Sequence, residues 1–358
     1  MYKFKNSKVK EIRTLGMPIP NHKEWLQLIN HSRYTQSSID FYNQGELVEQ
    51  LESRVAKIVG KQSALFFNKG TIAQYSALKS AEEKKNNSNF IAHPLSHIAW
   101  DEDDAYRSLL KLNGILIGEL NKPFSIKDIT AVDTDVSAVI IELPLRRAGF
   151  KLTEWEELNK IHQWCKSHNV HLHMDGARLW ESTSYYQKTM ADIASLFDTV
   201  YVSLYKGIGA LGGAILAGEP DFIESCQTWR NRFGGCAFTS FPLLISALEG
   251  LDTRYEKIPS LVQRAHSVAE QLAKFPQLDV NRPQSNGFFV FVKGDREKLK
   301  KKAEDITQSM GIKLFNDITF FPKTHNQMIE IQIGVNHHTI SDEEIDTYFS
   351  QLLESFSH

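Results

Sequence analysis

The sequence predicts an α/β protein in which a mostly parallel β-sheet is covered by helices and followed by a smaller α+β domain. Three observations predict this class. The length of 358 residues suits about two domains. Up to about residue 250, short apolar runs alternate with helical stretches, which implies crossover connections between parallel strands. Beyond residue 250, charged helices separate single strands, which is typical of an α+β arrangement.

The first part of the chain opens with an amphipathic helix over residues 45–60. Apolar residues recur at helical spacing from Leu47 to Ile58, and Gly60 is a typical C-terminal stop. The remaining expected elements of this part are strands over 63–67, 138–142, 170–174, 199–205 and 213–217, helices over 72–82 and 153–167 (the second opened by a capping box at Thr153), and a surface loop over 82–89.

The second part contains fewer elements. The run Ser341-Asp342-Glu343-Glu344 matches a capping box and predicts the start of a final helix that ends near residue 355. The other expected elements are helices over 260–275 and 296–310 and strands over 287–292 and 329–335.

Charge and composition exclude several classes of protein. Lys plus Arg number 41 and Asp plus Glu number 43, a near-balance that argues against a dedicated binder of nucleic acid or anionic membranes. The three cysteines are too few for a disulfide framework. The first residues lack the apolar core of a signal peptide, and no apolar run approaches the roughly 20 residues that span a bilayer. We therefore expect a cytoplasmic protein.

The first of three unusual loops contains Asn68-Lys69-Gly70-Thr71. In open parallel sheets, ligands bind beyond the carboxyl ends of the strands, where this loop is expected. It precedes a helix whose free amide groups and dipole favour an anion such as phosphate. The alternative is that these residues merely cap the helix.

The second loop places Asp175 at the end of an apolar strand and Arg178 three residues later. A carboxylate there is costly to desolvate without a cationic partner. A guanidinium in this position can bind a substrate carboxylate. A structural ion pair between Asp175 and Arg178 explains the same residues equally well.

The third loop carries Lys206 directly after the apolar run 199–205, followed by Gly207. A lysine in partly apolar surroundings has a lowered pKa and becomes nucleophilic toward carbonyl groups. The alternative is a lysine that extends its charge to solvent from a strand end. Together the three loops match the requirements of pyridoxal 5′-phosphate (PLP), namely a Schiff-base lysine, an acid at the pyridine nitrogen and a phosphate cradle.

At these loops the sequence resembles a known family. The segments HMDGARL (173–179) and SLYKGIGALGGAILAG (203–218) resemble the aspartate-loop and lysine-loop signatures of low-specificity threonine aldolases. That group belongs to the PLP-dependent β-eliminating lyases, which have the aspartate-aminotransferase fold. The resemblance extends through 39–78, 96–102 and 140–158, and it implies a PLP-dependent transferase-like large domain.

The resemblance also implies a division of the chain and a set of site residues. We expect an N-terminal arm over 1–38 that packs on the small domain or on a partner subunit, a PLP-binding large domain over 39–250 and a small α+β domain over 251–358. The resemblance assigns Lys206 to the Schiff base, Asp175 to the pyridine nitrogen, Arg178 to the substrate carboxylate, Gly70 and Thr71 to the phosphate with Ser203 as a second contact, and His97 to stacking on the ring and to catalysis as a base.

Several positions depart from the family pattern, mostly on the substrate side. Tyr205 stands where a small residue, usually serine, precedes the family lysine, and Leu143-Pro144 replaces an Asn-Thr pair. Near the N-terminus, Arg13-Thr14-Leu15-Gly16 stands where the family has an Arg-Ser-Asp-Thr stretch whose serine helps to hold the carboxylate. No arginine follows Arg296, although the family's small domain supplies a second carboxylate contact.

Two pairs of histidines have spacings that metal sites use. His171 and His173 share one strand face, and His93 and His97 are four residues apart, but no carboxylate or cysteine set completes a site at either pair. We therefore expect no metal. The acidic run 101–104 is interpreted as a solvated loop.

The resemblance implies an enzyme of amino-acid metabolism. We expect a PLP-dependent aldehyde-lyase that cleaves threonine or allo-threonine to glycine and an aldehyde by retro-aldol cleavage. The alternatives are β-elimination, racemisation or transamination of another amino acid, and a catalytically silent binding protein that keeps the fold. The expected partners are the amino-acid substrate and further copies of the chain in a homodimer or homotetramer, with neither nucleic acid nor membrane.

Overall fold

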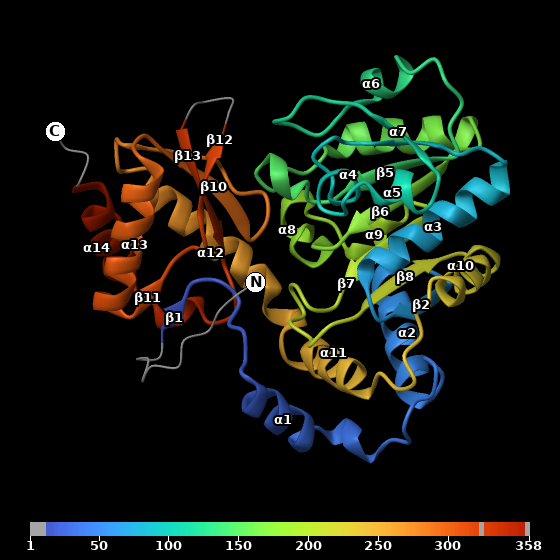
Figure 1. Cartoon of the computed structure of the whole chain (residues 1–358), viewed down its shortest axis with the longest axis horizontal. Helices are drawn as coiled ribbons and strands as arrows, with labels where there is room; N and C mark the ends of the chain where they lie inside the picture. Colours follow the sequence, from blue (N-terminus) through green and yellow to red (C-terminus); the bar gives the residue numbers. More distant parts are fainter. Residues whose placement is uncertain (1–11, 322–325, 355–358) are drawn as a thin grey trace. The chain divides into compact units, whose positions relative to one another are not determined.

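A computed structural model describes residues 12–321 and 326–354, and the chain forms two compact units (Figure 1). The larger unit spans Pro20–Pro259, and the smaller unit combines residues 12–19 with residues 260–354. The larger unit is therefore longer at both ends than the domain predicted over 39–250. The first eleven residues of the predicted N-terminal arm lie outside the described residues.

The larger unit is built on a seven-stranded sheet with the order β2-β8-β7-β6-β5-β3-β4. Strands β7, β6, β5, β3 and β4 pair in parallel, whereas β8 runs antiparallel to both of its neighbours. This confirms the predicted α/β class with a mostly parallel sheet. The strands are β2 (Ser63–Phe67), β3 (Asn89–Ala92), β4 (Asn113–Leu116), β5 (Ala138–Glu142), β6 (His171–Gly176), β7 (Thr199–Ser203) and β8 (Ala214–Gly218).

Helices cover both faces of this sheet. Alternate strand residues point to opposite faces, and on β7 the residues of both faces are buried. On β7, Val200 and Val202 belong to a core shared with α2, α7, α9 and α11, whereas Tyr201 belongs to a core shared with α3 and α10. The helices of this unit are α1 (His22–His31), α2 (Glu46–Val59), α3 (Gly70–Lys85), α4 (His97–Trp100), α5 (Ala105–Ser108), α6 (Ile126–Thr130), α7 (Trp155–Ser167), α8 (Thr183–Tyr186), α9 (Met190–Ala194), α10 (Pro220–Arg232) and α11 (Phe241–Thr253), with the short 3₁₀ helices η1 (Arg33–Gln36), η2 (Arg146–Ala148) and η3 (Leu179–Glu181).

Some predicted elements differ from those in the structure. The predicted capping box at Thr153 is wrong, because the N-cap residue of α7 is Glu154 and its side chain makes no capping hydrogen bond. The predicted loop over 82–89 is mostly regular structure, since α3 continues to Lys85 and β3 starts at Asn89. Strand β7 ends at Ser203, so Lys206 lies in the loop beyond it.

The smaller unit has its own sheet and core. Strands β9 (Leu278–Val280), β10 (Gly287–Val292), β12 (Ile318–Phe321) and β13 (Asn326–Gln332) form an antiparallel sheet, and β1 (Arg13–Thr14) pairs with β11 (Ile312–Lys313). Its helices are α12 (Ile258–Leu272), α13 (Arg296–Met310) and α14 (Asp342–Leu353). The predicted capping box at Ser341 is confirmed, with the Glu344 side chain bonding back to the cap.

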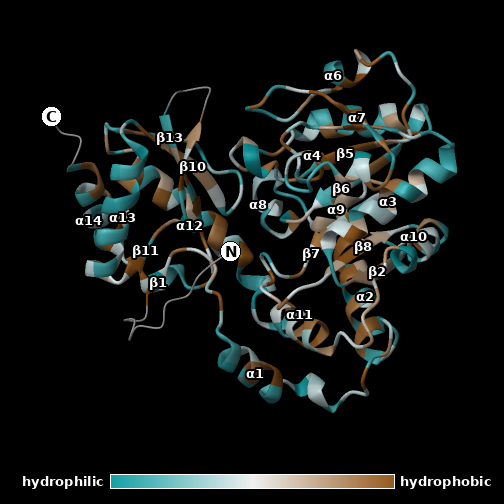
Figure 2. Ribbon diagram, in the orientation of Figure 1, coloured by the Kyte–Doolittle hydropathy of each residue, from teal (hydrophilic) through white to brown (hydrophobic). Residues whose placement is uncertain are grey.

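The hydropathy of the residues matches their position in the fold, with hydrophobic residues in the central strands and hydrophilic residues on the surface helices. In Figure 2 the central strands β8 and β10 are mostly hydrophobic, whereas the surface helix α13 shows many hydrophilic residues. None of the helices in the described part of the chain combines the length and the apolar composition needed to cross a membrane.

Candidate active site

The loops singled out in the sequence lie at one edge of the larger sheet. Strands β2 and β7 both run antiparallel to β8, so they point the same way, and β6 and β5 pair in parallel with β7 and with each other. The carboxyl ends of these strands therefore face one side of the unit. Asp175, Lys206 and the start of α3 at Gly70 all lie at that side.

Asp175 is a buried acid near the end of β6. Its Oδ1 accepts a hydrogen bond from the Ala177 amide at 3.1 Å. Burial raises the pKa of Asp175, and the positive charges of Lys206 and then His97 oppose this rise. The charges of Lys206 and His97 thus act on Asp175, so these three residues lie near one another.

Lys206 lies in the loop after β7, where its amine is largely removed from water. Burial lowers the pKa of Lys206 to about 8, and the nearby Arg178 guanidinium acts in the same direction. Asp175 and Glu142 oppose this fall in the pKa of Lys206. A lysine with that pKa is about one-tenth neutral at pH 7, which is several hundred times the fraction for an ordinary lysine. The amine is therefore suited to attack a carbonyl group.

The start of α3 fits an anion such as a phosphate. Lys69 is the N-cap residue, and its side chain makes no capping hydrogen bond to the first turn of the helix. A Cβ atom added at Gly70 would lie 2.1 Å from the Tyr201 hydroxyl, which explains why glycine stands here. Ser203 lies on the same face of β7 as Tyr201, and its buried Oγ has no hydrogen-bond partner within the described chain.

His97 begins α4 and is held by two acidic side chains. Its Nδ1 lies 2.9 Å from Glu102 Oε1, and its backbone amide donates to Glu142 Oε2 at 2.7 Å. The hydrogen bond to Glu102 raises the pKa of His97. The Glu102 side chain is only 4% exposed, so interpreting the whole run 101–104 as a solvated loop was wrong for this residue.

Arg178 lies at the N-terminal end of η3. Its guanidinium stands over the Phe150 ring at 5.5 Å, and its charge acts on Lys206 and on the neighbouring Glu181. Thr71 follows Gly70 in the first turn of α3 and is half-buried.

Two carboxyl groups of this site, the half-buried Glu142 and the buried Glu181, were missed in the sequence. Glu142 ends β5 in register with Asp175, and burial followed by the charge of Asp175 raises its pKa to about 7. Glu181 ends η3, and burial raises its pKa to about 7. Glu142 could have been found in the sequence, because it is an acidic residue at the end of an apolar run, like Asp175. Nothing in the sequence distinguishes Glu181 from a surface residue.

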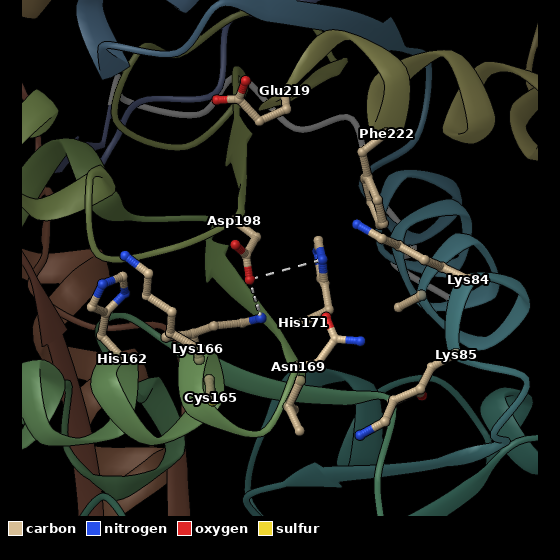
Figure 3. A pocket seen from close by; sticks show the side chains of 14 residues that line it. Lys84, Lys85, His162, Cys165, Lys166, Asn169, His171, Asp198, Glu219 and Phe222 are labelled. Atoms are coloured by element: carbon tan, nitrogen blue, oxygen red, sulfur yellow. Dashed lines mark hydrogen bonds and ion pairs between the residues drawn. The ribbon is translucent and has the colours of Figure 1, made fainter.

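A cavity lies elsewhere in the larger unit, near the opposite ends of the strands (Figure 3). It has a volume of about 340 Å³ and is lined by residues near the starts of β5, β6 and β7, including His171 and Asp198. His171 stacks on Phe222 at a ring distance of 4.1 Å and bonds to Thr199. None of the predicted site residues lines this cavity. Over the described residues, no group of three or more His, Cys, Asp or Glu side chains is arranged to hold a metal ion.

Comparisons with known proteins agree with one another. A profile of the β-eliminating lyase family matches residues 38–295. The low-specificity L-threonine aldolase of Eremothecium gossypii is 24% identical over 324 residues, which cover 86% of this chain and 78% of that protein. The structure of a candidate L-allo-threonine aldolase of Listeria monocytogenes EGD-E is 33% identical, covers 96% of both chains and has a TM-score of 0.89. A candidate aromatic amino acid β-eliminating lyase/threonine aldolase of Exiguobacterium sp. 255-15 is 28% identical, covers 97% of this chain and 98% of its own, and has a TM-score of 0.91.

Proposed function

The chain belongs to the β-eliminating lyase family, and from this premise we propose that it is a PLP-dependent aldehyde-lyase that cleaves threonine or allo-threonine to glycine and acetaldehyde. The similarity to threonine aldolases supports the substrate class. The observation that carries the proposal is the half-buried amine of Lys206, with its lowered pKa of about 8, beside the buried acid Asp175.

The residues at this edge of the sheet suit PLP. When bound, PLP supplies an aldehyde for amino groups and a ring that withdraws electrons from the bond being broken. Lys206 would hold the aldehyde carbon, and Asp175 would keep a proton on the ring nitrogen. The helix start at Gly70 and Thr71, together with the unpartnered Ser203 hydroxyl, would hold the phosphate.

The substrate side of the proposal rests on Arg178 and His97. Arg178 would bind the substrate carboxylate through its planar pairs of N–H donors. Glu102 accepts the hydrogen on Nδ1 of neutral His97, which leaves the lone pair on Nε2 free to take the β-hydroxyl proton. Removal of that proton starts the cleavage between Cα and Cβ.

Replacing Gly70 with alanine is expected to weaken PLP binding about tenfold or more, because overpacking of this kind costs about 1–3 kcal/mol. The added Cβ collides with the Tyr201 hydroxyl and shifts the helix start. A double variant with Tyr201→Phe is expected to recover only part of the affinity, since a ring carbon remains 2.7 Å away. Titration of each apoprotein variant with PLP measures its affinity for the cofactor. If Gly70→Ala binds PLP as tightly as the wild type, the start of α3 does not bind the cofactor.

Glu102→Gln is expected to move the acidic limb of the kcat profile to lower pH. The hydrogen bond to Glu102 raises the pKa of His97, and a base must lose its proton to act, so loss of the bond extends activity to lower pH. The maximal kcat is expected to fall about tenfold, because the ring loses the partner that orients it. Asp103→Asn is the matched control, since that side chain is exposed. An acidic limb at the wild-type position would exclude His97 as the titrating base.

The reaction itself is tested with a panel of amino acids and detection of the products. Formation of glycine and acetaldehyde from threonine or allo-threonine is the expected result. Ammonia with a keto acid from another amino acid would indicate β-elimination, an interchange of enantiomers would indicate racemisation, and an amino-group transfer would indicate transamination. A purified protein that binds PLP and converts none of the amino acids would favour a binding role.

We further propose that the protein is a cytoplasmic homodimer or homotetramer. An exposed cluster of Phe41, Tyr42 and Phe238 supports the oligomer, since its rings contact one another at 5.4 and 5.6 Å on the surface of the larger unit. The cytoplasmic location rests on the few, scattered cysteines. Sedimentation velocity tests the assembly, and a monomer at micromolar concentration would overturn it.

A further inference from the structure

The mechanism leaves one buried acid of the site without a role. Glu181 ends η3, and the residue is only 2% exposed. Its Oε2 has no hydrogen-bond partner among the described residues. A buried carboxyl oxygen without a partner is costly and rare in folded proteins, so its presence calls for a functional reason.

Glu181 lies between the two cations of the site. Its Oε1 is 2.6 Å from the position that a Cβ atom would take on Gly207, the residue after Lys206. Burial raises the pKa of Glu181 to about 7, and the charges of Arg178 and then Lys206 oppose this rise. Arg178 begins the same short helix, and Trp180 ties that helix to β7 by donating to the Ser203 carbonyl at 2.8 Å. Arg178 and Lys206 are thus the charged groups that face Glu181.

We propose that Glu181 is a positioning residue that acts as the internal counter-ion of Arg178 until the substrate carboxylate binds, and that Glu181 then takes a proton from solvent. This inference rests on the proposed role of Arg178. One guanidinium can balance only one carboxylate, so a substrate carboxylate on Arg178 leaves the buried Glu181 carboxylate without a balancing charge and next to a second negative charge. The substrate carboxylate stays ionised, and the Glu181 carboxylate becomes a neutral acid.

The neighbouring acids have hydrogen-bond partners of their own. Glu142 accepts hydrogen bonds from the backbone amides of His97 and Arg146, and Glu102 bonds to the His97 ring. Asp175 accepts the Ala177 amide and is close to two cations. Oε2 of Glu102 and Oε2 of Glu181 both lack a partner among the described residues. The charge of Arg178 acts on Glu181 and is not among the charges that act on Glu142 or Asp175, so Glu181 is the acid that loses its balancing charge when a substrate carboxylate occupies Arg178.

The test measures glycine binding to the PLP-loaded enzyme by its visible spectrum between pH 6 and 8.5. If Glu181 must be protonated for binding, the Kd of the wild type rises with pH above about 7, by up to tenfold per pH unit. Glu181→Gln has no proton to gain, so its Kd is expected to lack this rise. The glycine amine and Lys206 also titrate, but they do so in both proteins. The ratio of the wild-type Kd to the Glu181→Gln Kd therefore isolates the contribution of Glu181. Glu156→Gln, an exposed acid on α7, is the matched control and is expected to follow the wild type.

Calorimetry of the wild type in buffers of different ionisation enthalpy gives a second readout that needs no variant. Glycine is expected to draw up to one more proton than methylamine near pH 8, because methylamine has no carboxylate. Equal proton uptake for the two amines, or a constant Kd ratio between wild type and Glu181→Gln, would overturn the inference. Neither measurement requires cleavage of threonine. An enzyme that shows the proton uptake but cleaves no β-hydroxy amino acid would contradict the proposed function and leave the role of Glu181 standing.

Discussion

Lys206→Ala is expected to abolish the reaction, with kcat lower by about four orders of magnitude or more, equivalent to about 5 kcal/mol or more of barrier. Among the described residues, Lys206 is the lysine with a lowered pKa whose charge acts on Asp175. The variant is also expected to lose the visible absorption of the lysine-bound cofactor and to retain no PLP after borohydride reduction.

A matched control separates this effect from loss of folding. Lys57→Ala removes an exposed lysine on α2 and is expected to keep both the activity and the reducible linkage. Mass spectrometry after reduction locates the bound cofactor. A Lys206→Ala protein that still carries covalently reduced PLP would show that another amine forms the linkage.

Asp175→Asn is expected to lower kcat by about two to four orders of magnitude, because a neutral amide cannot hold a proton on the ring nitrogen. The substitution preserves the shape of the side chain, so the Ala177 amide can still find an oxygen acceptor. Burial stays the same while the negative charge is lost, and the pKa of Lys206, which Asp175 raises, is therefore expected to fall in the apoprotein.

Both consequences of Asp175→Asn can be measured. Steady-state kinetics gives kcat, and the pH dependence of amine modification in the apoprotein gives the direction of the change at Lys206. Asp221→Asn, an exposed position on α10, serves as the control. A variant with nearly wild-type kcat would exclude Asp175 as the partner of the ring nitrogen.

The sequence predicted most of the larger sheet because its strands are short apolar runs between helical repeats. Strands β2 and β5 have the predicted bounds, β7 ends two residues earlier than predicted, and β6 and β8 differ by one or two residues at both ends. Strand β3 was missed because it is a four-residue strand that starts with a polar residue, so its alternation is too brief to detect.

The sequence revealed the reactive residues of the site only where a charged residue follows an apolar strand. Asp175 and Lys206 stand out because charged residues directly follow apolar runs, and this signal needs no knowledge of the fold. Glu102 was misjudged because it lies in an acidic run, where its neighbours Asp101 and Asp103 are exposed but its own side chain turns inward to His97.

By itself, the sequence determined the α/β class, the family resemblance and the positions of Lys206 and Asp175, because these depend on residue order and on local periodicity. Only the tertiary structure decided which acids share the site. Glu142, Glu102 and Glu181 come from three separate segments, and their burial and their partners arise only when the strand ends and loops meet. Burial sets the proton affinity of a carboxyl group, and burial is a property of the folded chain rather than of its sequence.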